Sequence, residues 1–313
     1  MDRRGCGAST APPGVAGSPR KRSSQDARSS RITVAGMSTA ADHAANRAYW
    51  DVLAAAHGQD DYYDTRALIG GESSLVAEEE QALSAAVGDS ARLDGVDIVH
   101  VQCHIGFDAI TLARRGGRVT GVDFSPAALA KASSIAERCG VEVDWVEADV
   151  CEISERLERL HGRFDLAWAT IGVLCWIGDL EAWMRSVATM LRPRGQMVLV
   201  DGHPLGTMIS TIDPLALTVP YGGGARLPNS DGLSYAGVEV RPGANVEFAY
   251  SLGEVVTAAA DAGLEIVQLV EHLDVSFDHR SGVVHHERDG RWRLRVDGQA
   301  LPTLYTLRAV RPE

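Results

Sequence analysis

Two acidic residues and one glycine each lie close to the end of a β-branched run of the sequence. Residues 102–108 (QCHIGFD) follow the first run, and Gly106 precedes an expected helix, where a backbone passes close to a ligand. Asp123 ends the second run, the position at which a carboxylate accepts both hydroxyls of a ribose. Asp149 follows the third run and is placed to accept from the amine of an adenine. In this order and spacing, the three residues predict a cradle for an adenosine group.

The glycine pattern and the charge of residues 102–108 indicate which of two nucleotide cofactors this loop suits. A dinucleotide site needs the pattern GxGxxG so that the backbone can approach a pyrophosphate. Within this loop only Gly106 is a glycine, and Asp108 adds negative charge near the start of the expected helix. An anion repels a pyrophosphate but suits the cationic sulfonium and the amine of S-adenosylmethionine. The loop therefore favours S-adenosylmethionine over a nicotinamide dinucleotide.

These residues can meet only if strands and helices alternate and bring the strand ends to one edge of a sheet. One helix is expected to begin at Asp179, with apolar residues at helical spacing, and another at Ser125-Pro126. Such alternation is typical of an α/β fold with a doubly wound parallel sheet. The expected strands cover residues 97–102, 118–123, 141–147, 164–169, 196–201, 264–271 and 301–310.

Less regular segments flank and interrupt this alternation. Helical periodicity in residues 37–90 predicts an N-terminal helical lid. Residues 203–250 are rich in Gly, Pro and Tyr, and residues 277–300 contain hairpin turn signals. We expect both segments to be insertions that cap the strand ends, within a single domain of residues 37–313.

The charge of the chain is unevenly distributed. Residues 1–36 carry seven Arg or Lys and two Asp, a balance of +5, so the remainder of a chain with net charge −12 carries −12 − 5 = −17. This basic segment is rich in Gly, Ser and Pro, and we expect it to be a disordered, dispensable tail. A body so acidic argues against nucleic acid as a partner. No apolar run reaches the roughly 18 residues that span a bilayer, so we expect no membrane partner either.

Cysteine and histidine spacing gives no sign of a disulfide framework or a metal site. The five cysteines are an odd number, are widely spaced and form no CxxC pair, which is typical of a reduced cytoplasmic protein. His285 and His286 are adjacent but have no further ligands at metal-binding spacing. We therefore expect no metal.

Several segments together resemble one enzyme family. Residues 99–132 (VHVQCHIGFDAITLARRGGRVTGVDFSPAALAKA) resemble the first motif and following acidic loop of class I S-adenosylmethionine-dependent methyltransferases. Residues 46–63, 172–204, 251–266 and 301–309 are similar to a bacterial small-molecule branch of that family, so the resemblance extends over most of residues 45–311. It implies a Rossmann-like, seven-stranded sheet whose last strand is antiparallel. It also implies transfer of a methyl group to an N, O or C nucleophile.

The resemblance implies a role for individual residues. Gly106 would lie under the methionine group, Asp123 would hold the ribose and Phe124 would flank the adenine, whose edge would meet Asp149. The family's usual Pro-Gly-Gly is replaced here by residues 193–195 (PRG). The full expected cofactor set is Gln102, Cys103, His104, Gly106, Asp123, Phe124, Asp149, Val150, Thr170 and Gly172.

The methyl acceptor should lie beyond the ends of the fourth and fifth expected strands. His203 follows the fifth strand and is our candidate general base, with packing or a loop hydrogen bond as its alternative role. Aromatic side chains are expected to wall an acceptor pocket, although core packing would equally explain them. These side chains are Tyr62, Tyr63, Trp176, Tyr221, Tyr235 and Tyr250.

These expectations favour a cytoplasmic enzyme, a monomer or homodimer, that methylates a small aromatic or heteroaromatic molecule of the secondary-metabolite type. The sulfonium methyl is already activated, so the protein needs mainly to align the reactants and exclude water. Two alternatives stay open. One is a non-catalytic adenosine-binding module, and the other is a methyltransferase that acts on protein or RNA.

Overall fold

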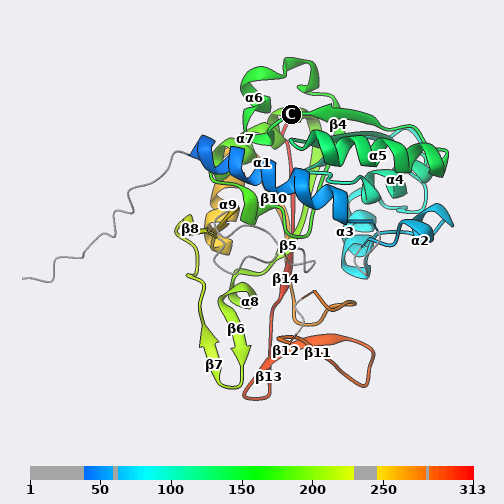
Figure 1. Ribbon diagram of the computed structural model, residues 1–313. Helices are drawn as coiled ribbons and strands as arrows, with labels where there is room; N and C mark the ends of the chain where they lie inside the picture. The colour runs from blue at the N-terminus through cyan, green and yellow to red at the C-terminus, as the bar shows by residue number, and fades with distance from the viewer. Residues whose placement is uncertain (1–38, 59–62, 229–244, 280–281) are drawn as a thin grey trace, which may run out of the picture. The chain divides into compact units, whose positions relative to one another are not determined.

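The computed structural model describes residues 39–58, 63–228, 245–279 and 282–313. The chain divides between Gly36 and Met37, and all of the described residues belong to the second unit, Met37–Glu313. They contain a seven-stranded sheet in the order β3-β2-β1-β4-β5-β14-β10 (Figure 1). Its strands are β1 (Asp97–Val101), β2 (Arg118–Asp123), β3 (Asp144–Glu147), β4 (Phe164–Thr170), β5 (Leu191–Gly202), β10 (Glu265–His272) and β14 (Leu304–Val310).

The strand directions confirm the expected topology. Strands β1 to β5 are parallel, and β14 is antiparallel to both of its neighbours, β5 and β10. Three strand starts, those of β3, β5 and β14, differ from the prediction by three residues or more. β3 begins at Asp144 because the amide of Val141 still donates to Ala136 at the end of a helix. β5 begins early, at Leu191, where it already pairs with Phe164 of β4.

Helices cover both faces of the sheet because the side chains of each strand alternate between the two faces. On β1, Ile98 belongs to the core cluster that contains residues of α3 and α4. Its neighbour Val99 belongs to the cluster that contains residues of α7 and α9. This two-sided core is what the doubly wound fold requires. The four helices are α3 (Ala77–Val87), α4 (Phe107–Arg114), α7 (Leu180–Met190) and α9 (Leu252–Asp261).

The two helix starts expected from the sequence have side-chain caps. Asp179 Oδ1 accepts from the amide of Ala182, 2.8 Å away, at the start of α7. Ser125 Oγ accepts from the amide of Ala128, 3.1 Å away, at the start of α5 (Pro126–Cys139), which has proline in its first turn. These hydrogen bonds satisfy amides that have no partner within the helix.

Further helices and strands lie outside the main sheet. The N-terminal helices are α1 (Thr39–Ala56) and α2 (Thr65–Ile69), and α6 (Ile153–Arg156) follows β3. The hairpin β6–β7 and the small sheet β11–β12–β13 lie side by side (Figure 1), and residues of both form one apolar cluster. The elements of the two insertions are α8 (Pro204–Met208), β6 (Ile209–Ile212), β7 (Leu215–Leu217), β8 (Ala225–Pro228), β9 (Val246–Ala249), β11 (His285–His286), β12 (Trp292–Val296) and β13 (Gln299–Leu301).

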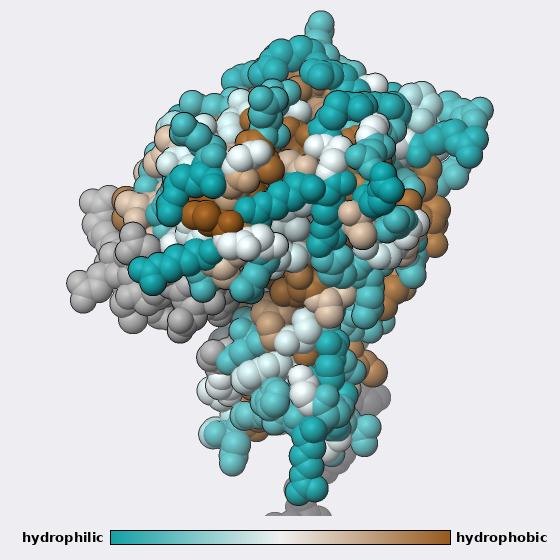
Figure 2. Space-filling view, turned by 90° about the vertical axis from the view of Figure 1, so that its right-hand side faces the viewer, coloured by the Kyte–Doolittle hydropathy of each residue, from teal (hydrophilic) through white to brown (hydrophobic). Residues whose placement is uncertain are grey.

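The surface in Figure 2 is mainly hydrophilic, with hydrophobic side chains scattered among the polar ones. Among the residues that the structure describes, no helix combines the length and the apolar composition that crossing a membrane requires.

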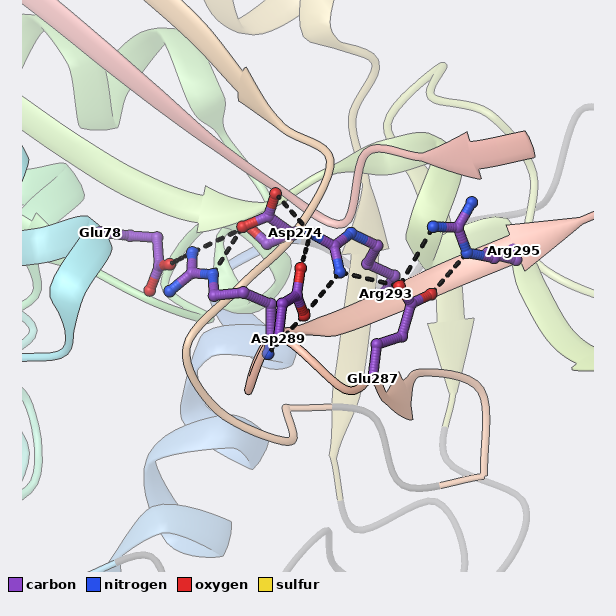
Figure 3. Close-up of polar contacts among 7 residues, drawn as sticks. Glu78, Asp274, Glu287, Asp289, Arg293 and Arg295 are labelled. Carbon is purple, nitrogen blue, oxygen red and sulfur yellow. Dashed lines mark hydrogen bonds and ion pairs between the residues drawn. The ribbon is translucent and has the colours of Figure 1, made fainter. Parts of the chain in front are cut away.

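An ion-pair network joins the small C-terminal sheet to α3 (Figure 3). Arg291 Nη2 lies 2.5 Å from Glu78 Oε1, and its Nε lies 2.6 Å from Asp274 Oδ1. Arg293 extends the network to Asp289 and Glu287. The Glu78 side chain is only 1% exposed, so the guanidinium of Arg291 supplies the countercharge of a buried carboxylate.

Candidate active site

A cavity lies at the carboxyl ends of β1, β2 and β4, and together with its mouth it holds about 680 Å³ of space. Trp50 of α1 and Tyr63, just before α2, complete its wall. Eight of the ten expected cofactor residues line it: Gln102, Cys103, His104, Gly106, Asp123, Phe124, Thr170 and Gly172. The other two, Asp149 and Val150, line a smaller adjoining cavity that shares Gln102, Phe124 and Trp176 with the first.

The loop after β1 has an unusual backbone. Gln102, His104 and Gly106 all have positive φ angles, of 56°, 48° and 78°, although only the last is a glycine. A Cβ atom on Gly106 would lie 2.5 Å from the Trp145 ring and 2.9 Å from the Cβ atom of Ala132. The glycine is therefore required by packing against the protein. Gly106 also lines the cavity, so its close approach to a ligand stays a prediction.

Asp123 links this loop to the end of β2. Its Oδ2 accepts from the amide of His104 at 2.8 Å, and its Oδ1 accepts from the amide of Ser125 at 2.9 Å. Burial raises the pKa of Asp123 to about 6, although these hydrogen bonds oppose the shift. A carboxylate has about four acceptor positions, so Asp123 keeps capacity for hydroxyl groups of a ligand in the cavity.

Asp149 interacts with α1, a contact that the sequence did not indicate. Its Oδ2 lies 2.7 Å from His43 Nδ1, and its Oδ1 accepts from the amide of Cys151. Burial opposes ionisation, but His43 outweighs it and lowers the pKa of Asp149. His43, Asp149 and Cys151 are close enough to share a metal ion. However, His43 Nε2 accepts from the amide of Gly178, and burial raises the pKa of the Cys151 thiol, so this set does not suit one.

His104 contributes a neutral ring to the cavity wall. Its Nε2 lies 2.8 Å from His57 Nδ1, and its ring packs edge-on against Trp50 with centroids 4.9 Å apart. Burial, aided by the positive charges of His57 and Lys131, lowers the pKa of His104 to about 3. The ring is therefore uncharged near neutral pH and serves as a packing and hydrogen-bonding surface.

A second cavity, which we call the acceptor cavity, lies over the ends of β4, β5 and β14. It holds about 1330 Å³ of space including its open side, and it shares Ile171 and Gly172 with the cofactor cavity. Most of its lining is apolar. Among the described residues, its titratable side chains are Cys175, Asp201, Glu247, Tyr250, His279 and Tyr305.

Asp201 fixes the wall between the two cavities. Its Oδ1 accepts from the amides of Gly172 and Gly202, at 2.6 and 2.7 Å, and its Oδ2 accepts from the amide of Leu174 at 3.0 Å. Sequence reasoning did not assign this role, although Asp201 ends a strand as Asp123 does. Glu247 and His279 were also missed, because they lie in insertions without a regular pattern.

His203 does not have the position expected of a general base. It caps α8, its Nδ1 accepts from the amide of Leu205, and its Nε2 lies 2.8 Å from Glu271 Oε1 on β10. Burial lowers its pKa, although Glu271 opposes the shift. Both ring nitrogens are thus engaged within the fold, and His203 is not among the described residues that line the acceptor cavity. We correct its role to that of a structural link.

The expected aromatic residues do not all lie at the acceptor cavity. Trp176 and Tyr63 line the first cavity and not the acceptor cavity, so their assignment to the acceptor stays a prediction that this lining does not support. Tyr221 is 48% exposed and lines neither cavity. Tyr62 and Tyr235 lie outside the described residues. The aromatic side chains that line the acceptor cavity are Phe248, Tyr250 and Tyr305.

Comparisons with known proteins agree with this architecture. Residues 99–197 match the family described as "Methyltransferase domain". A ubiquinone biosynthesis O-methyltransferase of Methylobacterium sp. (strain 4-46) is 27% identical over 205 residues, which cover 66% of this chain and 70% of that protein. The enzyme of the same name from Azorhizobium caulinodans is 29% identical over 127 residues, 41% of this chain and 46% of that one.

The fold also matches a solved structure, an S-adenosylmethionine-dependent methyltransferase from Mesorhizobium loti. The TM-score is 0.52 at 20% identity, and the match covers 78% of this chain and all of the other. The residues present fit the cofactor, because buried carboxylates with remaining acceptor capacity line a cavity at the strand ends. The sheet topology and the methyltransferase domain matched by residues 99–197 support the assignment of the chain to the class I S-adenosylmethionine-dependent methyltransferases.

Proposed function

We propose that this enzyme methylates a hydroxyl group of a small, largely apolar aromatic molecule held in the acceptor cavity. The observation that carries the proposal is the wall of Ile171 and Gly172 that the cofactor and acceptor cavities share, because a methyl group has to pass directly between its donor and its acceptor. The names of the two relatives, both O-methyltransferases, support a hydroxyl acceptor over nitrogen or carbon.

The expected cofactor residues lie along the edge of the sheet in the order in which the parts of the cofactor follow one another. Asp149 follows β3 and Asp123 ends β2, so an adenine and its ribose would lie over these strands, with Phe124 between them. The loop after β1 would then contact the sulfonium region. Bound there, S-adenosylmethionine supplies a methyl group that is already activated for displacement. The chain itself orients the two reactants and excludes water from them.

A hydroxyl acceptor must lose its proton as the new O–CH₃ bond forms and the S–CH₃ bond breaks. Among the described residues, His279 is the histidine that lines the acceptor cavity, whereas His203 does not line it. An imidazole has a pKa suited to accepting a proton near neutral pH. We therefore assign proton acceptance to His279, which leaves S-adenosylhomocysteine and the methylated acceptor as products.

The test combines binding with an acceptor screen. Asp123→Ala should abolish binding of S-adenosylhomocysteine in calorimetry, because it removes the carboxylate at the ribose position. Phenols and catechols should release S-adenosylhomocysteine faster with the wild-type enzyme than amines or indoles of similar size. Unchanged affinity in the variant would overturn the cofactor site. Turnover of amines alone, or of protein or RNA alone, would overturn the hydroxyl acceptor.

A further inference from the structure

Some of the hydroxyl groups that line the acceptor cavity are already hydrogen-bonded within the fold. The hydroxyl of Tyr250 donates to the backbone carbonyl of Ile177 at 2.8 Å. Thr207 Oγ1 donates to the backbone carbonyl of His203 at 3.2 Å. Because each of these hydroxyls spends its one hydrogen on the backbone, they hold the walls of the cavity in place. Recognition of an acceptor therefore falls to other polar groups of the lining.

Two hydroxyl groups of the lining have no such use. Thr303, just before β14, and Tyr305, within β14, both line the acceptor cavity, and each residue is only 2% exposed. Thr303 Oγ1 has no hydrogen-bond partner among the described residues, and no group in that part of the chain hydrogen-bonds to the hydroxyl of Tyr305. A buried hydroxyl normally has a partner, because leaving it without one lowers stability. These two hydroxyls are therefore candidates for binding a ligand in the cavity.

The neighbouring strands fix both residues in position. The amide of Thr303 donates to the carbonyl of His272 at 3.1 Å, and its carbonyl accepts from the amide of His203 at 2.8 Å. Tyr305 lies opposite Asp201 of β5 in the sheet, and its ring packs edge-on against His203 with centroids 6.3 Å apart. Side chains two residues apart along an extended chain point to the same face, which agrees with the presence of both in one lining. Asp201 also holds Gly172, so Tyr305 lies near the wall shared with the cofactor cavity.

The charges around the two hydroxyls favour an uncharged ligand group. Among the described residues, the acceptor cavity is lined by the carboxyl groups of Asp201 and Glu247 but by no Arg or Lys. Burial, followed by the negative charge of Asp201, raises the pKa of Tyr305 well above its usual range, so its hydroxyl keeps its proton. An uncharged oxygen has two lone pairs and can accept from both hydroxyls. A carboxylate on the ligand would instead add a buried charge without a countercharge.

We propose that Thr303 and Tyr305 bind an uncharged oxygen substituent of the acceptor, other than the hydroxyl that is methylated. The preferred substrate is then an aromatic ring with two oxygen groups. One lies at the wall shared with the cofactor cavity, and the other is bound on the β14 side. The inference rests on the proposed use of this cavity for a hydroxyl acceptor. It assigns to Thr303 and Tyr305 the selection and orientation of the acceptor, whereas His279 accepts the proton.

The first test compares methoxyphenols with ethylphenols of the same ortho, meta or para pattern, because an ethyl group has nearly the shape of a methoxy group but no lone pair. For at least one pattern, the wild type should have a kcat/KM about tenfold higher for the methoxyphenol. Thr303→Val and Tyr305→Phe each remove a hydroxyl and keep the shape of the side chain. Each should lower kcat/KM for that methoxyphenol about tenfold, mainly through KM, and leave the ethylphenol within about twofold.

Urea unfolding supplies a readout that needs no turnover. Thr303→Val removes a hydroxyl that the fold leaves without a partner, so the urea midpoint should stay the same or rise. The matched control is Thr306→Val on the other face of β14, where Thr306 Oγ1 lies 2.8 Å from His272 Nε2. The control should lower the midpoint and leave the preference for the methoxyphenol unchanged. An equal fall of the midpoint in Thr303→Val would show that the fold uses this hydroxyl, and would overturn the inference.

The turnover results separate this inference from the proposed function. Phenols that turn over with no preference for methoxy over ethyl at any pattern would overturn the inference and leave the proposed function standing. A preference that persists unchanged in both Thr303→Val and Tyr305→Phe would do the same. Failure of every phenol to turn over would overturn the proposed hydroxyl acceptor and this inference with it.

Discussion

Glu78 and Glu79 are consecutive residues of α3, both buried, yet they have opposite surroundings. Glu78 contacts Arg291 and Ser276, and its negative charge is compensated within the fold. Glu79 is hydrogen-bonded to Thr170 behind Asp108, and burial raises the pKa of Glu79 well above its usual range. Successive helix residues point about 100° apart, so one helix can serve both environments.

The difference helps to separate structural charges from functional ones. In the network of Figure 3, acids and arginines alternate, so the network is complete without a ligand. Asp108, which accepts from Thr170 Oγ1, lines the cofactor cavity, and within the described residues it has no Arg or Lys partner. A buried acid that the protein does not compensate is the more informative guide to a binding site.

The largest expected effect comes from removing the countercharge of Glu78. Arg291→Met should lower the free energy of unfolding by about 3 kcal/mol, because it leaves a buried carboxylate without a cation. Urea unfolding measures this loss. The double variant Glu78→Gln/Arg291→Met is the matched control, and it should recover most of the stability. The single variant Glu78→Gln completes the cycle. If the loss of stability in the double variant equals the sum of the losses in Glu78→Gln and Arg291→Met, the two side chains do not interact.

Glu79→Gln should have a smaller effect with a distinctive pH dependence. The raised pKa means that the folded state keeps a proton that the unfolded state releases above its usual pKa of 4.5. The contribution of Glu79 to the stability of the wild type therefore falls as the pH rises from 4.5 through the raised pKa, and the variant should lack this contribution. Its free energy of unfolding should match the wild type near pH 4 and exceed it on the order of 1 kcal/mol at pH 8. Urea titrations at both pH values check this, and parallel pH profiles would contradict a protonated Glu79.

The smallest effect is expected at the solvent-facing end of the ion-pair network. Arg295 Nε lies 2.5 Å from Glu287 Oε1, but the arginine side chain is 43% exposed. Water and salt replace such a contact readily, so Arg295→Gln should leave the urea midpoint unchanged within error. A loss comparable to that of Arg291→Met would mean that burial does not set the strength of these pairs.

The sheet and much of the cofactor cavity could be predicted because their signals are local. β-branched runs marked β1 and β2, and a carboxylate at or just after a strand end identified Asp123 and Asp149. The same rule would have found Asp201, which lies one residue before the end of β5 and holds the wall between the cavities. Long-range partners left no such signal: Arg291 and Glu78 are 213 positions apart, and His43 and Asp149 are 106 apart.

The sequence by itself determined the order of strands and helices and the edge of the sheet where a nucleoside would bind. Alternating hydrophobicity and helix caps act over a few residues, so they can be read without the fold. Only the tertiary structure decided which distant residues meet. A side chain at position 106 would clash with Trp145, and His203 lies within hydrogen-bond distance of Glu271. On α3, Glu79 lies near Asp108, whereas Glu78 pairs with Arg291. Steric contacts and compensation of buried charge depend on which distant side chains meet, and that is settled by packing.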